Sequence, residues 1–142
     1  MSNSTLNIIK IGGNVIDDDI QLEAFLEKFA AIPGKKILVH GGGKIATRIA
    51  AQLGLEAKMV EGRRITDKDM LDVVTMVYAG LTNKNIVATL QKYKCDAIGL
   101  SGADGNVIKA VKRPVKEIDY GFAGDILADS VNSLAIKKFL DA

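Results

Sequence analysis

The chain alternates between short apolar runs that end at glycines and longer segments in which apolar residues recur at helical spacing. Short apolar runs bounded by turn residues are typical of buried strands, and apolar residues three and four positions apart indicate helices. The strands predicted in this way span residues 6–11, 36–40 and 96–100, with a ribbon at residues 107–111 and 115–118. The predicted helices span residues 20–30, 45–53, 66–92 and 131–140.

Strands that alternate with helices indicate an α/β fold with an open, mainly parallel sheet and helices on both faces. The length of 142 residues fits one domain over residues 1–142. Aromatic residues make up 5% of the chain and there is no tryptophan. The core must therefore consist mainly of Ile, Val, Leu and Ala, as is usual for parallel sheets.

Charge and composition exclude several classes of function. The formal net charge is +2 and the basic residues are dispersed, which argues against a nucleic-acid partner. The single cysteine, Cys95, excludes an internal disulfide, and with His40 as the single histidine we expect no metal site. No stretch reaches the roughly 20 apolar residues that span a bilayer, so we expect no membrane contact. The polar N-terminus lacks a signal-peptide pattern, from which we expect a cytoplasmic location.

Glycines follow the first predicted strand at its carboxyl end, which is where ligands bind in open α/β sheets. Lys10 lies at this end and is followed by Gly12 and Gly13. A lysine charge beside unshielded backbone N–H groups suits a phosphoryl group in transfer. A lysine that reaches solvent before a plain turn would show the same pattern.

Three consecutive glycines, Gly41, Gly42 and Gly43, join the second predicted strand to the second helix. Without side chains, the backbone can approach a ligand closely and the helix N–H groups can point at an anion. Three glycines in a rigid strand-to-helix junction favour this interpretation over a flexible loop. The turn therefore predicts a second contact with an anionic ligand.

Two known nucleotide-binding motifs match the sequence of this glycine turn to different degrees. The P-loop pattern fails because Ile45 stands where that motif needs Ser or Thr. The dinucleotide fingerprint fits better, with Gly41, Gly43 and Ala46 at its small-residue positions and Glu61 near its acidic position. A nicotinamide-binding domain therefore stays open as an alternative.

Two arginines, Arg63 and Arg64, directly precede the predicted helix at residues 66–92. An arginine there could hold a carboxylate through two parallel hydrogen bonds, although a surface pair would look the same. The glycine-dense residues 99–105 leave the third predicted strand, where a ligand role for Ser101 stays open. Polar, glycine-rich ends gathered at one edge of a sheet favour an anion-binding site.

Taken together, these motifs resemble the amino-acid kinase family. The residues that carry the resemblance are Lys10-Ile11-Gly12-Gly13-Asn14, His40-Gly41-Gly42-Gly43, Gly62-Arg63-Arg64-Ile65-Thr66 and the Gly-Leu-Ser-Gly-Ala-Asp-Gly stretch at residues 99–105. They are most similar to the members that phosphorylate the γ-carboxylate of N-acetyl-L-glutamate in arginine biosynthesis. The resemblance implies an ATP-dependent kinase, with ATP and Mg2+ as the co-substrate, and the fold of that family's N-terminal domain.

The resemblance also implies a role for each matched residue. Lys10 would stabilise the transferring phosphoryl group, and Gly12-Gly13 would line its path. The Gly42-Gly43 pair would give backbone N–H contacts near the acceptor carboxylate. Arg64 would hold the α-carboxylate of the acylated glutamate. Catalysis would then rest on positioning and charge balance, without a covalent intermediate.

Members of the family are roughly twice as long as this chain, and their second half binds the nucleotide. We therefore expect residues 1–142 to be the N-terminal, acyl-amino-acid-binding half, without the C-terminal nucleotide-binding domain. The family also implies a homo-oligomer. The residues leave open whether the acyl group is acetyl or succinyl, whether arginine exerts feedback, and how large the oligomer is. A non-catalytic amino-acid-binding module remains a further alternative.

Overall fold

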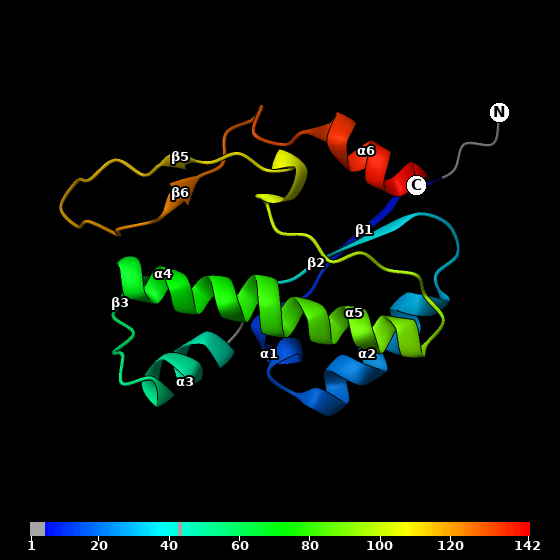
Figure 1. Ribbon diagram of the computed structural model, residues 1–142, viewed down its shortest axis with the longest axis horizontal. Helices are drawn as coiled ribbons and strands as arrows, with labels where there is room; N and C mark the ends of the chain where they lie inside the picture. Colours follow the sequence, from blue (N-terminus) through cyan, green and yellow to red (C-terminus); the bar gives the residue numbers. More distant parts are fainter. Residues whose placement is uncertain (1–4, 43) are drawn as a thin grey trace. The chain divides into compact units, whose positions relative to one another are not determined.

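A computed structural model describes residues 5–42 and 44–142, so the predicted site residue Gly43 lies outside the described residues. The structure confirms the mixed α/β class (Figure 1). By its internal contacts the chain forms two compact units. The first unit comprises residues 1–46 and 76–99, and the second comprises residues 47–75 and 100–142.

A parallel pair of strands forms the sheet of the first unit. β1 (Asn7–Lys10) pairs with β2 (Lys36–Val39), and Ile9 lies opposite Leu38 in the ladder. The helices of this unit are α1 (Gly13–Ile16), α2 (Asp19–Ala31), the π-helix η1 (Met76–Thr82) and α5 (Asn83–Lys92). The succession of strand, helix and parallel strand is the alternation that the sequence predicts.

The core of the first unit lies between one face of this sheet and two helices. Its buried side chains, from α2 and α5, are Leu26, Phe29, Ile86 and Leu90, each at most 4% exposed. Ile9 and Leu38 pack against them from the sheet, and Cys95 packs against them as a half-buried thiol. Because successive side chains of a strand point to opposite faces, Ile8 lies on the other face of the sheet and is exposed.

A side-chain cap begins α2. The Asp18 Oδ1 atom accepts hydrogen bonds from the backbone N–H groups of Ile20 and Gln21, both at 3.0 Å. These are amides that the first turn of a helix leaves without a helical acceptor. The Gln21 side chain also donates to Asp18 Oδ2 at 2.8 Å. These hydrogen bonds, chiefly the two from Gln21, hold the pKa of the Asp18 carboxyl below its ordinary value.

The second unit contains short elements joined by turns. Its helices are α3 (Ile45–Gln52), of which the first two residues belong to the first unit, α4 (Lys68–Thr75), the 3-10 turn η2 (Asp104–Asn106) and α6 (Ser133–Asp141). Its strands are β3 (Met59–Val60), β4 (Arg63–Arg64), β5 (Val111–Lys112) and β6 (Gly124–Asp125), which form two antiparallel pairs. A bridge between Thr66 and Gly121 connects the β4–α4 junction with the approach to β6.

The structure differs from the predicted strands in two places. Residues 96–100 join no sheet, although Ala97 packs against the core of the first unit. β5 pairs with residues 124–125 rather than with residues 115–118. The ladder of β5 with β6 ends before Pro114, which has no N–H to donate to it.

The helix predicted for residues 66–92 is confirmed as three consecutive segments, α4, η1 and α5. The last predicted helix is confirmed as α6. No helix in the described ranges is long and apolar enough to cross a membrane.

Candidate functional site

The first unit places Lys10 and the two glycines that follow it at the carboxyl end of β1. Lys10 is the last residue of the strand, Gly12 is the N-cap of α1, and Gly13 is the first residue of that helix. The Lys10 Nζ lies 3.9 Å from the point that a Cβ would occupy at Gly12. The ammonium group therefore lies close to Gly12, which has no side chain and begins a helix whose first amides lack a helical acceptor.

The glycine turn after β2 begins beside the turn after β1. Lys10 is opposite Val39 in the parallel ladder, and the Ile11 N–H donates to the Val39 carbonyl at 2.9 Å. Asp17, the C-cap of α1, accepts a 2.8 Å hydrogen bond at Oδ1 from the backbone N–H of Lys44. The structure thus brings Lys10, Gly12, Gly13 and Gly42 to one edge of one sheet.

A tyrosine that sequence reasoning missed packs on this turn. A Cβ added at Gly42 would lie 1.6 Å from Cε1 of Tyr78, a side chain of η1. Gly42 is buried, whereas Gly41 has open space where its Cβ would be. Position 42 therefore needs glycine because of a neighbouring ring, and no local sequence signal points to a contact with a residue so far along the chain.

Arg64 belongs to the second unit and points to α3. Its Nη2 donates to the Thr47 Oγ1 at 2.7 Å, and the side chain is half-buried. The neighbouring Arg63 is exposed and turns to the opposite side of the strand, as adjacent strand residues do. Because of this alternation, only one of the two arginines can face a given ligand.

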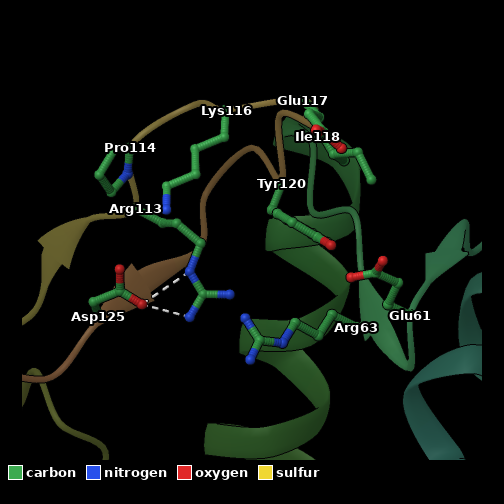
Figure 2. A pocket seen from close by; sticks show the side chains of 9 residues that line it. All are labelled: Glu61, Arg63, Arg113, Pro114, Lys116, Glu117, Ile118, Tyr120 and Asp125. Atoms are coloured by element: carbon green, nitrogen blue, oxygen red, sulfur yellow. Dashed lines mark hydrogen bonds and ion pairs between the residues drawn. The ribbon is translucent and has the colours of Figure 1, made fainter.

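A hollow of about 510 Å³ lies in the second unit on the Arg63 side of β4. Its lining residues are Glu61, Arg63, Arg113, Pro114, Lys116, Glu117, Ile118, Tyr120 and Asp125. Figure 2 shows the charged ends of Arg63, Arg113 and Lys116 directed into the hollow. The lining also includes three acidic side chains, Glu61, Glu117 and Asp125, so its formal positive and negative charges are equal in number.

One ion pair organises this hollow. The Arg113 Nε donates to Asp125 Oδ1 at 2.8 Å, and its Nη2 bonds the same oxygen (Figure 2). The Arg113 guanidinium also lies 5.8 Å from the centre of the Tyr120 ring. The hydrogen bond from Arg113 is the main cause that lowers the pKa of Asp125 below its ordinary value of 3.8. Sequence reasoning missed the pair because it depends on the register of β5 with β6.

The structure weighs against the dinucleotide fingerprint. Glu61 and Gly62 form the two-residue turn of the β3–β4 hairpin, with φ of 51° and 74°. The fingerprint instead needs its acidic residue on a βαβ unit, where it can reach a ribose beside the glycine turn. Glu61 lies at the tip of an antiparallel hairpin.

No group of His, Cys, Asp and Glu suited to a metal ion occurs among residues 5–42 and 44–142. The candidate ligand contacts are the glycine turns of the first unit and Arg64 of the second, and their roles stay predictions.

A sequence model of the amino acid kinase family matches residues 5–142. The chain is 63% identical over 121 residues to an acetylglutamate kinase of Bacteroides thetaiotaomicron, and equally identical to one of Phocaeicola vulgatus. Each of these matches covers 85% of this chain and 47% of the relative. The chain thus spans about half the length of the curated relatives it matches.

The crystal structure of smu.665 from Streptococcus mutans UA159 has a similar fold. The TM-score is 0.73, and the match covers 96% of this chain and 54% of that chain. At 23% identity this likeness concerns the fold alone.

Proposed function

The chain belongs to the amino acid kinase family, and from that premise we propose that it supplies the substrate half of a kinase that phosphorylates N-acetyl-L-glutamate. The observation that carries the proposal is the position of the Lys10 ammonium over Gly12, beside the glycine turn that follows β2. A positive charge near backbone amides that no side chain shields suits a phosphoryl group whose charge must be balanced in transfer.

In the proposed reaction the γ-phosphoryl group of ATP moves to a γ-carboxylate oxygen of the acylated glutamate. The bond between the γ-phosphorus and the bridging oxygen breaks, and an acyl phosphate and ADP form. Lys10 would balance the charge in flight, and the Gly12-Gly13 turn would line the path. Amides of the Gly42-Gly43 turn would hold the acceptor carboxylate, and Arg64 would hold the α-carboxylate.

ATP with Mg2+ would be the co-substrate, and we assign none of the residues of this chain to its adenine. The acyl group is proposed to be acetyl, as in the names of the two relatives, with succinyl as the alternative. Such an enzyme would serve arginine biosynthesis in the cytoplasm and would assemble as a homo-oligomer.

Calorimetric titration of the chain with N-acetyl-L-glutamate tests the substrate, with NAD and MgATP as parallel titrants. We expect saturable binding of acetylglutamate and none of NAD. Binding of NAD instead would overturn the kinase proposal. If none of the three binds, the titration is repeated on a chimera that joins this chain to the second half of the Bacteroides thetaiotaomicron relative.

The variant Arg64→Ala tests the carboxylate clamp, with Arg63→Ala as the matched control. Loss of a charge-assisted hydrogen bond costs about 1.5–3 kcal/mol, so acetylglutamate affinity should fall roughly ten- to a hundredfold. Arg63→Ala should leave the affinity within about threefold, because its side chain lies on the other side of β4. The opposite ranking would move the clamp to Arg63 and the charged hollow.

A further inference from the structure

The side chain of His40 is hydrogen-bonded at both ring nitrogens, at the entry to the second glycine turn. Its Nδ1 lies 2.8 Å from the Gly41 carbonyl oxygen, and its Nε2 lies 3.1 Å from Nδ2 of Asn83. Asn83 is the first residue of α5 and is 6% exposed. All three residues belong to the first unit.

Two independent contacts require the same tautomer of this imidazole. A carbonyl oxygen only accepts, so the Nδ1 of His40 must carry the proton that it donates to Gly41. At the other end, Lys84 Nζ donates to Asn83 Oδ1 at 3.1 Å. An ammonium group only donates, so this contact fixes the amide with its Nδ2 towards His40, and Nε2 must accept.

The Asn83 side chain also packs directly against Gly99. A Cβ added at Gly99 would lie 1.9 Å from Asn83 Oδ1 and 2.9 Å from a methyl carbon of Val87. Lys84 Nζ donates to the Gly99 carbonyl at 2.9 Å, which links the segment around Gly99 to the start of α5. The result is a line of hydrogen bonds from Gly99 through Lys84, Asn83 and His40 to Gly41.

The end of this line determines the direction of a neighbouring amide. The Gly41 carbonyl and the Gly42 N–H belong to one planar, trans peptide unit, so they point in opposite directions. Fixing the Gly41 oxygen towards His40 therefore directs the Gly42 N–H away from His40. A glycine pair has no side chain that could hold this peptide otherwise.

We propose that His40 and Asn83 are positioning residues that orient the Gly41–Gly42 peptide, so that the Gly42 N–H is pre-aimed at the acceptor carboxylate. This inference rests on the proposed function, because it is there that Gly42 contacts the substrate. The gain is preorganisation, since a turn held in one orientation loses less freedom when the ligand binds.

Two variants of His40 test the hydrogen bonds of Nδ1 and Nε2 separately. His40→Asn keeps an amide donor near the Nδ1 position and loses the acceptor for Asn83. His40→Gln keeps an amide oxygen that can reach Asn83 and loses the donor to Gly41. We expect acetylglutamate affinity to fall about tenfold in His40→Gln and clearly less in His40→Asn. Equal affinity of wild type and folded His40→Gln would overturn the proposal.

Nitrogen NMR provides a readout that does not depend on substrate. His40 is the single histidine of the chain, so its ring nitrogens are assigned without ambiguity. The wild type should show a protonated Nδ1 and an unprotonated Nε2, and the Gly42 amide signal should move more in His40→Gln than in His40→Asn. A protonated Nε2 in the wild type, or an unmoved Gly42 signal in both variants, would overturn the positioning role.

Asn83→Asp tests the second link, with Asn85→Asp as the control of equal charge on the same helix. A carboxylate can only accept, so in Asn83→Asp the facing Nε2 should acquire a proton, while Asn85→Asp should leave the ring signals unchanged. Identical ring spectra in the two variants would overturn the Asn83 link. If the wild type binds no acetylglutamate but shows the expected ring and Gly42 signals, the proposed substrate fails while the positioning of the turn stands.

Discussion

Glycine at position 42 is required by its surroundings and not by its backbone angles. Gly42 is not among the glycines with positive φ, which include Gly34, Gly54 and Gly62. The constraint comes from the Tyr78 ring, which occupies the volume of a Cβ. The sequence could predict a close approach at this turn, since three glycines stand together, but the group that approaches Gly42 in the structure is a protein side chain.

Gly42→Ala should destabilise the chain by about 1–3 kcal/mol, because the Tyr78 ring must move to admit the methyl group. Gly41→Ala is the matched control, since its Cβ would enter open space and the cost should stay within about 0.5 kcal/mol. Urea unfolding of both variants measures the difference. Equal stability of the two variants would contradict the tight contact at Gly42.

The C-terminus of α5 carries a strained residue in an otherwise standard helix ending. The Lys94 N–H donates to the Gln91 carbonyl at 2.9 Å, and the Cys95 N–H donates to the Leu90 carbonyl at 3.0 Å. This is the Schellman arrangement, whose left-handed position is usually a glycine. Here that position is Lys94, with φ of 57°.

Lys94→Gly should therefore stabilise the first unit by about 1 kcal/mol, because a left-handed residue without a Cβ avoids the steric cost. Lys94→Ala removes the same charge but keeps the Cβ, so it should change stability by less than about 0.5 kcal/mol. Thermal unfolding of the two variants against wild type gives the comparison. A gain of equal size in Lys94→Ala would attribute the effect to charge and not to the backbone.

Apolar patterning predicted helices better than strands in this chain. The spacing of Met70, Val73, Val74, Val77 and Leu81 predicts one apolar side of the helix at residues 66–92. Met70, Val73 and Val77 are buried, whereas Leu81 is 44% exposed. Residues 96–100 are apolar for a different reason, since Ala97 packs against the core without joining a ladder. The same run leaves Ile98 67% exposed, so it is only partly covered. Ladder pairing depends on partners elsewhere in the chain, as the register of Val111 with Asp125 shows.

The ion pair between β5 and β6 predicts an acid sensitivity of the second unit. The Arg113 hydrogen bond lowers the pKa of Asp125 below 3.8 in the folded chain. Its contribution is therefore complete above the ordinary pKa of 3.8 and is lost as the pH falls through the lower folded value. Unfolding between pH 5 and about pH 2 should show a loss of stability that is smaller in Asp125→Asn.

The charge control for this acid titration is Asp129→Asn, which changes an exposed carboxylate of the same unit. It should retain the acid sensitivity of the wild type. A wild-type curve that coincides with that of Asp125→Asn across this range would show that the pair contributes nothing to the pH dependence.

Across the whole molecule, the proposed roles fall on residues of each compact unit separately. Lys10, Gly12 and Gly42 belong to the first unit, and Arg64 belongs to the second. The roles divide in the same way, since Lys10 is proposed to act on the transferring group and Arg64 on the bound substrate. Substrate binding and phosphoryl transfer should therefore be separable by mutation.

Lys10→Ala provides that separation when affinity is measured on this chain and turnover on the chimera with the second half of the Bacteroides thetaiotaomicron relative. A group that acts only on charge developing in the transition state changes turnover without changing ground-state binding. The value of kcat should fall by about 10²–10³, as for loss of one group that stabilises the developing charge. The Kd of the chain for N-acetyl-L-glutamate should stay within about threefold.

Lys28→Ala, an exposed lysine of α2, controls for the loss of one positive charge and should leave both quantities unchanged. Equal losses of affinity and turnover in Lys10→Ala would reassign Lys10 to substrate binding. Unchanged turnover would remove it from the reaction, and the ammonium over Gly12 would then be a side chain that reaches solvent at a strand end. The ratio of the two effects therefore decides whether the first glycine turn is a catalytic or a structural feature of this fold.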